Sequence, residues 1–369
     1  MSAIRQKPEG PLRRGWTTGA CATAAATAAY QALLTGSFPD PVTITLPRGQ
    51  EPSFSLERKK LAKTQATASI IKNAGDDPDI THGAEIVVTV ALKENLSGIY
   101  FHAGEGVGTV TRQGLALDIG EPAINPGPRS MIKNAIKSLA NKYKNVTAQG
   151  ISVTISIPGG EKLAKKTMNG RLGIKGGLSI LGTTGIVIPY SCASWINSIH
   201  RGVDVARAAN LKHIAAATGS TSEDAVQKIL NLHESALIDM GDFAGGLLKY
   251  LRQNPIEHLT IAGGIGKLTK LAQGAMDLHS SRSKVNMNEL SNMLVQLGAE
   301  TDIVKKAKKA NTASEVLELA QKSNLALGNL IARQARESAL ATLSGGTKID
   351  VMAFDRNGKC IGKSNLIND

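Results

Sequence analysis

The segment NGRLGIKGGLSILGTTGIVIPYS, residues 169–191, decides how the chain is interpreted, because it separates two parts with different patterns. It carries six glycines around two short apolar runs, 178–181 and 186–188. Glycine has no Cβ, so it accepts left-handed backbone and lets a ligand approach the main chain closely. The pattern predicts a buried strand between two glycine loops. We assign residues 158–190 to a glycine-rich, basic crossover between two domains.

Positive charge surrounds the first of these loops. Residues 160–176 contain a single acid, Glu161, against five basic residues: Lys162, Lys165, Lys166, Arg171 and Lys175. The charge predicts a site for an anionic ligand at the glycine loops. An alternative stays open, in which the glycines serve only chain geometry and the lysines form a solvated face.

The composition limits the number of domains and the kinds of partner that the chain can have. With 369 residues, 42% of them hydrophobic, the chain exceeds one ordinary domain and can form two cores. A formal charge of +13 indicates an acidic partner, whether nucleic acid, an anionic lipid surface or a small polyanion. Aromatic residues make up only 3% of the chain, which disfavours base-stacking platforms. Three dispersed cysteines without a CxxC pair, and no apolar run of about 18 residues, lead us to expect a soluble cytoplasmic protein.

Residues 1–157 are predicted to form an α+β domain with a mainly antiparallel sheet. Apolar and polar residues alternate at 42–46, 64–71, 85–92 and 98–104. Alternation with a period of two, interrupted by turns, is typical of antiparallel strands that are covered on one face.

An alanine-rich helix is predicted between Gly15 and Gly36. Thr17 or Thr18 can supply the N-cap oxygen, and Gly36 is a suitable stop. The free N–H groups at such a helix start can hold a carboxylate or phosphate of a substrate. The alternative is a well-capped helix whose small side chains pack closely on a sheet.

The loop NAGDDPDITHG, residues 73–83, combines acidic and imidazole side chains. Asp76, Asp77 and Asp79 surround a proline, which is a strong turn signal. Together with His82 they can also act as general acid or base, or bind a cation. Both interpretations stay open, and we take Asp76, Asp77 and His82 as the candidate catalytic residues.

Residues 191–345 are predicted to form a Rossmann-like α/β domain with a parallel sheet. Three units of strand, glycine turn and helix follow one another, with strands in 211–219, 236–241 and 258–264. Such succession specifies parallel strands joined by crossover helices. Ligands bind outside the carboxyl ends of the strands in these sheets.

Several polar residues and glycines fall at that edge: Thr218, Gly219, Ser220, Asp239, Gly241, Asp242, Gly263, Gly264 and Gly266. An acid that follows a strand can accept hydrogen bonds from ribose hydroxyls, so Asp239 and Asp242 are candidates for nucleotide binding. The alternative for Asp242 is the N-cap of the following helix.

Three further features complete the second half. Ser220 and Glu223 match a capping box at the start of a helix. Residues 286–343 are amphipathic and are predicted to form an outer helical layer. Residues 346–369 are predicted to form a C-terminal β-hairpin around an Arg-Asn-Gly turn.

Common catalytic signatures are absent from the sequence. The seven histidines are dispersed and none pairs with a cysteine at ligand spacing, so we expect no protein-held metal. The chain has neither a GxSxG elbow nor a Walker loop. A group-transfer enzyme whose cosubstrate carries the reactive group fits this pattern.

Eight motifs occur in one order along the chain: GWTTGACATAA, NAGDDPDITHG, GEGVGTVTRQGLAL, GEPAINPGPRSMI, EKLAKKTMNGRLGIKGGLSILGTTGIVIPYS, DMGDF, GGIGKLTKLAQG and DLHS. In these motifs the chain resembles the cobalt-precorrin-5B C1-methyltransferase family of anaerobic cobalamin biosynthesis. The resemblance runs from Gly15 to about His279 and includes the C-terminal hairpin. Trp16 and Ala20 depart from the residues more common in the family.

The resemblance implies methylation of C1 of a cobalt-containing tetrapyrrole by S-adenosylmethionine, to give cobalt-precorrin-6A. It implies no nucleic-acid or membrane partner, and it raises the possibility of hand-over from other enzymes of the pathway. The substrate bears many carboxylates, which basic residues and helix starts would hold.

On this basis we assign donor and substrate contacts from the residues. The donor is expected at Asp239 and Asp242, at Gly263, Gly264 and Gly266, and at the turn Gly182, Thr183, Thr184 and Gly185. The tetrapyrrole, expected in a cleft between the domains, would meet Thr17, Thr18, Arg112, Arg129, Lys133, Arg171, Lys175 and Lys267. Asp76, Asp77 or His82 would act as base.

Two other functions stay open from the residues alone. One is a kinase or other nucleotide-dependent transferase on the same sheet, which ATP binding would reveal. The other is a basic nucleic-acid binder, which steeply salt-dependent DNA binding would reveal.

Overall fold

The computed structural model describes residues 10–94, 96–143 and 150–364. The chain divides into two compact units, Met1–Ser191 and Cys192–Asp369. The predicted crossover, residues 158–190, thus lies within the first unit. Residues 365–369 of the predicted C-terminal hairpin lie outside the described residues.

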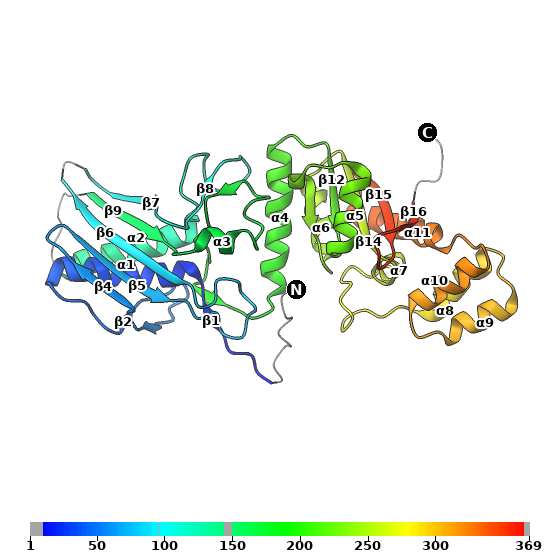
Figure 1. The fold of residues 1–369 in the computed structure, drawn as a ribbon, viewed down its shortest axis with the longest axis horizontal. Coiled ribbons are helices and arrows are strands. Elements are labelled where there is room, and N and C mark those ends of the chain that lie inside the picture. Colours follow the sequence, from blue (N-terminus) through cyan, green and yellow to red (C-terminus); the bar gives the residue numbers. More distant parts are fainter. Residues whose placement is uncertain (1–9, 95, 144–149, 365–369) are drawn as a thin grey trace. The chain divides into compact units, whose positions relative to one another are not determined.

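The first unit is built on a five-stranded sheet with strand order β4-β5-β6-β9-β7 (Figure 1). Its strands are β4 (Arg58–Leu61), β5 (Gln65–Ile71), β6 (Glu85–Lys93), β7 (Ile99–Ala103) and β9 (Gly150–Ser156). β4, β5, β6 and β9 pair antiparallel, and for β5 and β6 the alternation at 64–71 and 85–92 predicts this. The expectation that 98–104 is also antiparallel is wrong, because β7 pairs parallel with β9. A long connection through a helix separates β7 from β9, and such a crossover allows parallel neighbours.

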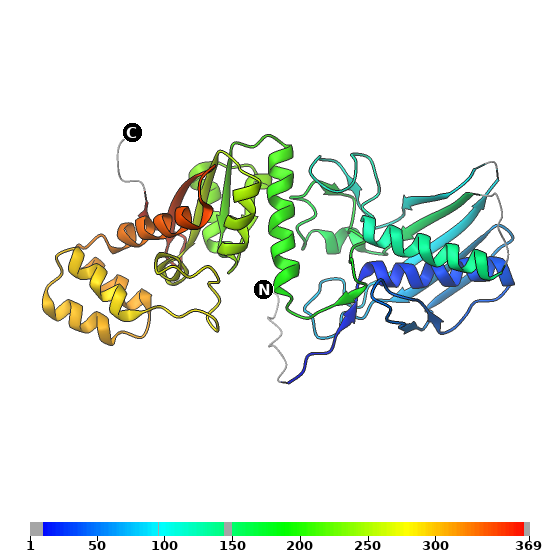
Figure 2. The same cartoon turned by 180° about the vertical axis from the view of Figure 1, so that it is seen from behind.

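Two helices cover one face of this sheet. α1 (Thr18–Thr35) and α2 (Pro126–Lys142) lie side by side, as the view from behind shows (Figure 2). The predicted limits of α1 are confirmed: the Thr17 hydroxyl caps it, and Gly36 ends it with a left-handed φ of 79°. Most of α1 is alanine and threonine and is fully buried, so its small side chains let it pack closely on β5 and β6. The tightly packed alternative is therefore correct for this helix.

The glycine-rich segment forms short pieces of structure against this core. β10 (Ile174–Lys175) pairs with β8 (Thr109–Val110), and β11 (Ile186–Val187) pairs with β1 (Gly15–Trp16). The predicted strand at 178–181 is wrong, since this run makes only isolated bridges.

Close backbone packing explains this irregularity. A Cβ at Gly177 would lie 2.2 Å from the main-chain oxygen of Gly106, and one at Gly182 would lie 2.4 Å from the Thr17 side chain. Gly177 therefore brings two main chains together, and Gly182 makes room for the Thr17 side chain. The remaining elements are the two-stranded sheet of β2 (Val42–Thr43) and β3 (Ser53–Phe54), and the short helix α3 (Gly160–Ala164).

The second unit is built on a mixed five-stranded sheet with strand order β13-β12-β14-β15-β16. Its strands are β12 (His213–Ala217), β13 (Leu237–Asp239), β14 (His258–Gly264), β15 (Lys348–Phe354) and β16 (Cys360–Lys363). The first four strands in this order are parallel, which the sequence predicts for β12, β13 and β14. β15 and β16 form the predicted hairpin, but β15 is also the parallel neighbour of β14, so the hairpin is part of this sheet.

Helices cover both faces of this sheet. α5 (Ser220–Leu230) packs on the face that carries Ala215 and Ala217. The other face, with Ile214 and Ala216, receives four helices: α4 (Cys192–Ala208), α6 (Ala244–Gln253), α7 (Ile265–Ala272) and α11 (Leu327–Leu343). Alternate residues of one strand point to opposite faces, which is why β12 supplies both cores.

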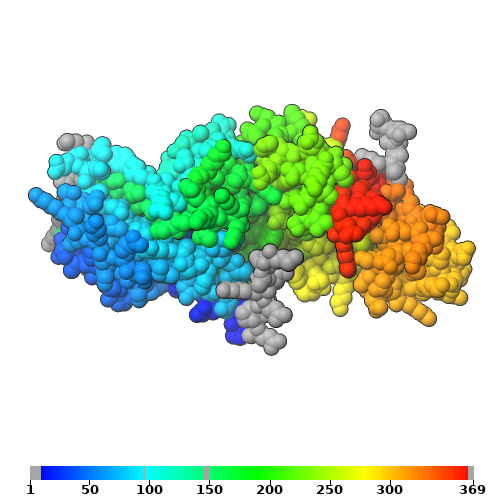
Figure 3. All heavy atoms as spheres, viewed as in Figure 1, coloured from blue at the N-terminus to red at the C-terminus, as the bar shows by residue number. Residues whose placement is uncertain are grey.

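The predicted outer helical layer is only partly correct. α8 (Met287–Gln296), α9 (Thr301–Lys309) and α10 (Ala313–Lys322) pack on one another beyond the sheet (Figure 1). α11 instead lies against β15 and β16. In the space-filling view the red C-terminal residues lie beside the orange residues that precede them in the sequence (Figure 3). Within the described residues, no helix is both long enough and apolar enough to cross a bilayer.

Candidate functional site

The second unit has a topological switch point between β12 and β14. The chain leaves β12 through α5 toward β13 on one side, and β14 continues through α7 on the opposite face. In open α/β sheets the crevice outside the carboxyl ends of two such strands is the usual ligand site. Here Thr218 and Gly263 stand at that edge, where the Thr218 N–H donates to the Ala262 oxygen at 2.9 Å.

Three glycines at this edge have neither a packing contact nor a left-handed backbone that would require glycine. A Cβ placed on Gly219, Gly264 or Gly266 would have no other described atom within 4 Å, apart from those of the neighbouring residues in the sequence. None of these three glycines has a left-handed φ. By contrast, a Cβ on Gly263 would lie 2.9 Å from the Thr218 hydroxyl oxygen. Open space over exposed main chain is what a closely bound ligand requires.

Both helices that begin here start at glycine. Gly219 is the N-cap of α5 and Gly264 is the N-cap of α7, and neither start has a side-chain cap among the described residues. The predicted capping box is therefore wrong, since Ser220 is already the first helical residue. Uncapped helix starts leave N–H groups for water or an anionic ligand.

Lys267 on α7 connects the loops at the switch point. Its Nζ donates to the Thr218 main-chain oxygen at 2.7 Å and forms an ion pair with Asp242 at 3.0 Å. Asp242 makes no cap bond to α6, whose N-cap is Phe243, so the capping alternative for Asp242 is wrong. The charge of Lys267 is thus already matched within the unit.

Asp239 ends β13, the strand beside β12. It follows Gly219 by about twenty residues, the separation at which an acid reaches ribose hydroxyls in doubly wound nucleotide sites. Its main-chain oxygen accepts a hydrogen bond from the Trp195 indole Nε1 at 3.1 Å. The sequence patterns did not single out Trp195, because it lies on α4 and only the tertiary fold brings it to Asp239.

In the first unit, the loop 73–83 connects β5 to β6 and holds the candidate acid–base residues. Asp76 accepts from the Arg13 N–H at 2.6 Å, and His82 Nδ1 accepts from the Ala74 N–H at 3.1 Å. Asp77 accepts from the Tyr190 N–H at 2.8 Å, and burial raises the pKa of this carboxyl above its ordinary value. Of the three candidates, Asp77 is thus the one whose buried environment favours the protonated form.

A buried ion pair supports this loop. Lys72, only 1% exposed, binds Asp79 at 2.6 Å. Burial alone would raise the pKa of Asp79, but the Lys72 charge and hydrogen bonds from Lys72 and Thr81 outweigh it and hold the pKa below its ordinary value. Asp79 is therefore an ionised structural residue.

The polar groups at the start of α1 form hydrogen bonds within the chain. The Thr17 hydroxyl accepts from the Ala20 N–H at 3.1 Å, and the Thr18 hydroxyl accepts from the Leu181 N–H at 2.9 Å. The Gly19 N–H donates to the Leu181 oxygen at 3.0 Å. Both threonines thus have internal hydrogen-bond partners, and their substrate role stays a prediction.

The turn 182–185, like the start of α1, contacts other residues of the first unit. Gly182 packs on Thr17, Gly185 packs on Leu46, and the Thr184 hydroxyl accepts from the Ile186 N–H at 3.3 Å. A neighbouring main chain, that of Gly127, approaches Thr183. The turn thus has packing contacts of its own, and its donor role stays a prediction.

The basic residues of the first unit differ in their partners. Arg129 donates to the oxygens of Ile124 and Pro122 and pairs with Glu121 at 3.1 Å, so it ties down the start of α2. The remaining four are at least partly exposed and stay candidates for an anionic substrate: Arg112, Lys133, Arg171 and Lys175.

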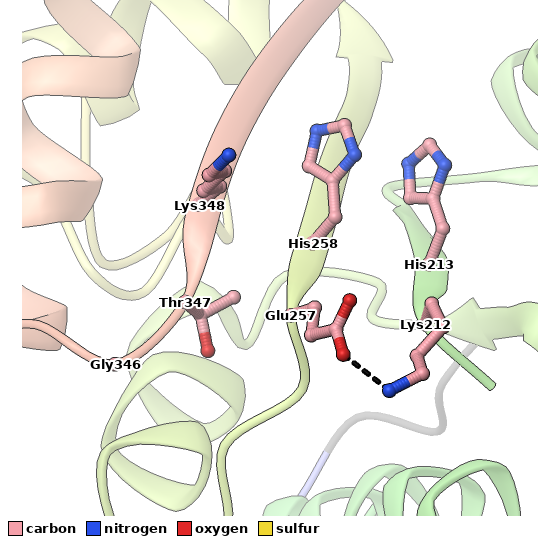
Figure 4. Close-up of a pocket in the computed structure, with 7 residues that line it drawn as sticks. All are labelled: Lys212, His213, Glu257, His258, Gly346, Thr347 and Lys348. Atoms are coloured by element: carbon pink, nitrogen blue, oxygen red, sulfur yellow. Dashed lines mark hydrogen bonds and ion pairs between the residues drawn. The ribbon is translucent and has the colours of Figure 1, made fainter. Parts of the chain in front are cut away.

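A cavity of about 670 Å³ lies at the opposite edge of the second sheet, at the amino ends of three strands (Figure 4). His213 and His258 stack there with ring centroids 3.9 Å apart, and Lys212 pairs with Glu257. Burial and the neighbouring His258 lower the pKa of His213. This cavity is separate from the switch point, and within the described residues no group of three or more potential ligands can hold a metal ion.

Sequence comparisons place the chain in a family. The sequence model described as CbiD matches residues 5–189, and the one described as CbiD, C-terminal domain, matches residues 277–365. The chain belongs to the CbiD family. This family membership agrees with the resemblance in the sequence motifs.

Curated CbiD relatives are similar over almost the whole chain. A Brucella canis protein named cobalt-precorrin-5B C(1)-methyltransferase is 54% identical over 362 residues, covering 98% of each chain. A protein of the same name from Bradyrhizobium sp. is 55% identical over 354 residues, 96% of this chain and 94% of the relative. A crystal structure of the cobalamin biosynthesis protein cbiD from Archaeoglobus fulgidus is 28% identical, covers 74% of this chain and 84% of that one, and has a TM-score of 0.40.

Proposed function

We propose that this CbiD-family protein transfers a methyl group from S-adenosylmethionine to C1 of cobalt-precorrin-5B, giving cobalt-precorrin-6A in cobalamin biosynthesis. The observation that carries the proposal is identity above 50% along nearly the full chain to relatives with that activity in their names. The second unit supports it, because its switch point is the type of crevice in which parallel sheets bind nucleotide-like ligands.

The donor is assigned to that crevice. Asp239 would accept the ribose hydroxyls, and the open main chain at Gly264 and Gly266 would lie against the adenosyl and methionine parts. The uncapped starts of α5 and α7 offer N–H groups for the donor carboxylate. Lys267 and Asp242, which neutralise one another, would hold the loops rather than bind charge.

The chemistry needs no protein nucleophile. The ring carbon attacks the methyl carbon, the bond from that carbon to sulfur breaks, and its electron pair stays on sulfur in S-adenosylhomocysteine. The protein's part is to align the two atoms and keep water away. Where the ring loses a proton, we assign the base to Asp77, because burial raises its pKa and its loop is held by Lys72 and Asp79.

The tetrapyrrole substrate carries carboxylates that match the excess positive charge of the chain. Basic residues of the first unit that are at least partly exposed would contact them: Arg112, Lys133, Arg171 and Lys175. The substrate would arrive from another enzyme of the pathway, since such precursors are labile.

Calorimetric titration tests the proposal. Saturable binding of S-adenosylmethionine, tighter than that of ATP, is expected, followed by a mass gain of one methyl group on the supplied tetrapyrrole. Asp239→Asn should weaken donor binding, whereas Asp302→Asn, the same change on exposed α9, should leave it unchanged. Tighter binding of ATP would favour a kinase, and lack of donor binding both with and without the tetrapyrrole would overturn the proposal.

A further inference from the structure

Trp195 lies at the end of β13 where the donor's base is expected. It is in the first turn of α4, and its Nε1 donates to the main-chain oxygen of Asp239 at 3.1 Å. This bond fixes the indole beside the residue assigned to the ribose. The carboxyl end of β13 is thus flanked by an acid and a large aromatic ring.

Gly241 and Phe243 both pack against the indole. A Cβ on Gly241 would lie 3.2 Å from the Cε2 and Cζ2 atoms of Trp195 and 3.3 Å from Nε1, so Gly241 sits over the ring. Gly241 takes a left-handed φ of 56°, which suits glycine and allows this close approach. Phe243 contacts the indole at a centroid distance of 6.3 Å.

Much of the Trp195 side chain is nevertheless exposed. Trp195 is 46% exposed, although tryptophan is usually well buried and aromatic residues form only 3% of this chain. A purely structural tryptophan on α4 would point into the sheet core, as Ile199 and Val203 do. Trp195 is instead fixed at the ligand edge with surface available for stacking.

We infer that Trp195 is the aromatic wall of the donor site and stacks on the adenine of S-adenosylmethionine. The inference rests on the donor site proposed above and identifies which part of the donor each residue meets. With the ribose on Asp239, the base attached to it lies within reach of the neighbouring indole. Planar bases stack on aromatic side chains through their π-faces, which gives affinity without hydrogen-bond readout.

The chain provides its own optical probe for this arrangement, because it has two tryptophans. Trp16 lies in the first unit and packs on Phe54 with ring centroids 5.5 Å apart. In a Trp16→Phe background, all tryptophan emission comes from Trp195. Titration with S-adenosylhomocysteine and with adenosine should change this emission saturably, and methionine alone should not.

Substitution separates stacking from the hydrogen bond. Trp195→Ala should weaken adenosine and S-adenosylhomocysteine binding roughly 5- to 150-fold, the range found for base–aromatic stacking. Trp195→Phe should retain most of the affinity, since a phenyl ring still stacks although it cannot donate to Asp239. Circular dichroism and thermal melting would check that each variant is folded.

The outcomes distinguish the two proposals. If calorimetry shows donor binding while the emission stays constant and Trp195→Ala binds normally, the stacking role is wrong and the donor site stands. Equal losses in the Phe and Ala variants would assign Trp195 a purely structural role through Asp239. If the parent protein binds no donor even with the tetrapyrrole present, both the donor site and the stacking role are wrong.

Discussion

Lys267 Nζ lies 2.7 Å from the main-chain oxygen of Thr218 and 3.0 Å from the Asp242 carboxylate. One side chain on α7 thus joins the loops that follow β12 and β13. These loops border the switch point, so their spacing sets the width of the proposed donor crevice. The sequence predicts that Lys267 binds substrate carboxylates, and these contacts lead us to propose that it positions the loops.

Replacing Lys267 with methionine should therefore loosen the crevice. The change removes a charged hydrogen bond from a partly exposed group, so the expected loss is about 1–2 kcal/mol in the free energy of unfolding. Donor affinity should fall with it, and tetrapyrrole affinity should not. Urea unfolding and calorimetry would measure the two effects. Lys306→Met, which breaks the exposed Lys306–Asp302 pair, is the matched control and should change neither.

The buried pair beneath the acidic loop should be costly to break. Asp79→Asn leaves Lys72 buried without its counter-charge, and the expected loss is about 3–5 kcal/mol in unfolding free energy. The pKa of Asp79 is lowered in the fold, so its contribution is present above the unfolded pKa and is lost as pH falls through the folded pKa. A double variant, Lys72→Met with Asp79→Leu, should recover much of the loss. If the losses in unfolding free energy of the single variants simply add in the double variant, the pairing of Lys72 with Asp79 is contradicted.

Asp77 should change the stability of the protein with pH in the opposite direction to Asp79. Its pKa is raised by burial, so its ionised form disfavours the fold, and stability declines as pH rises from the unfolded toward the folded pKa. Asp77→Asn keeps an oxygen for the Tyr190 N–H and should be more stable than the parent at neutral pH. The difference should vanish in acid, where the parent carboxyl is protonated.

The same variant tests the assigned base. Asp77→Asn should methylate slowly, with kcat reduced, while donor affinity measured by calorimetry stays unchanged. Asp76→Asn is the control on the neighbouring residue, and its kcat should change little. A normal kcat for Asp77→Asn would remove Asp77 from the mechanism.

Local features of the fold could be predicted because nearby residues determine them. The limits of α1 follow from Thr17, a run of alanine and Gly36, all within one segment. The parallel strands β12, β13 and β14 follow from the repeated order of strand, turn and helix. Pairing between distant segments could not be predicted in this way, and β7 was therefore assigned the wrong direction.

The site could be predicted in outline. Strand order alone places Asp239 and Gly264 at the ligand edge, since the rule depends only on where parallel strands end. The partner of each charged side chain could not be predicted: Arg129 satisfies the carbonyls before α2, and Thr18 satisfies Leu181. The residue types indicate that these groups can bind anions. Only the packing shows that they already form hydrogen bonds within the chain.

Cysteine reactivity should follow burial. Burial raises the pKa of the Cys21 thiol to about 12, and the side chain is completely covered on α1. Native protein treated with iodoacetamide should thus be modified at Cys192 and Cys360, which are half-exposed, and not at Cys21. Mass spectrometry after digestion would locate the modifications. Cys21 should react only when the first unit unfolds, and its labelling in native protein would contradict the buried position of α1.

Gly266 offers the sharpest separation of stability from function. It is the second residue of α7, and no described atom beyond the adjacent chain lies within 4 Å of where its Cβ would be. Gly266→Ala should therefore stabilise the protein, by up to about 1 kcal/mol, because alanine loses less backbone entropy in a helix. If the donor lies against this main chain, the added methyl group should at the same time weaken S-adenosylmethionine binding. Gly298→Ala is a control that separates backbone strain from ligand contact, because Gly298 also faces open space but has a left-handed φ of 77°. That variant should lose stability and keep donor affinity. A Gly266→Ala protein that is more stable and binds the donor as tightly as the parent would show that the crevice at α7 does not hold the donor.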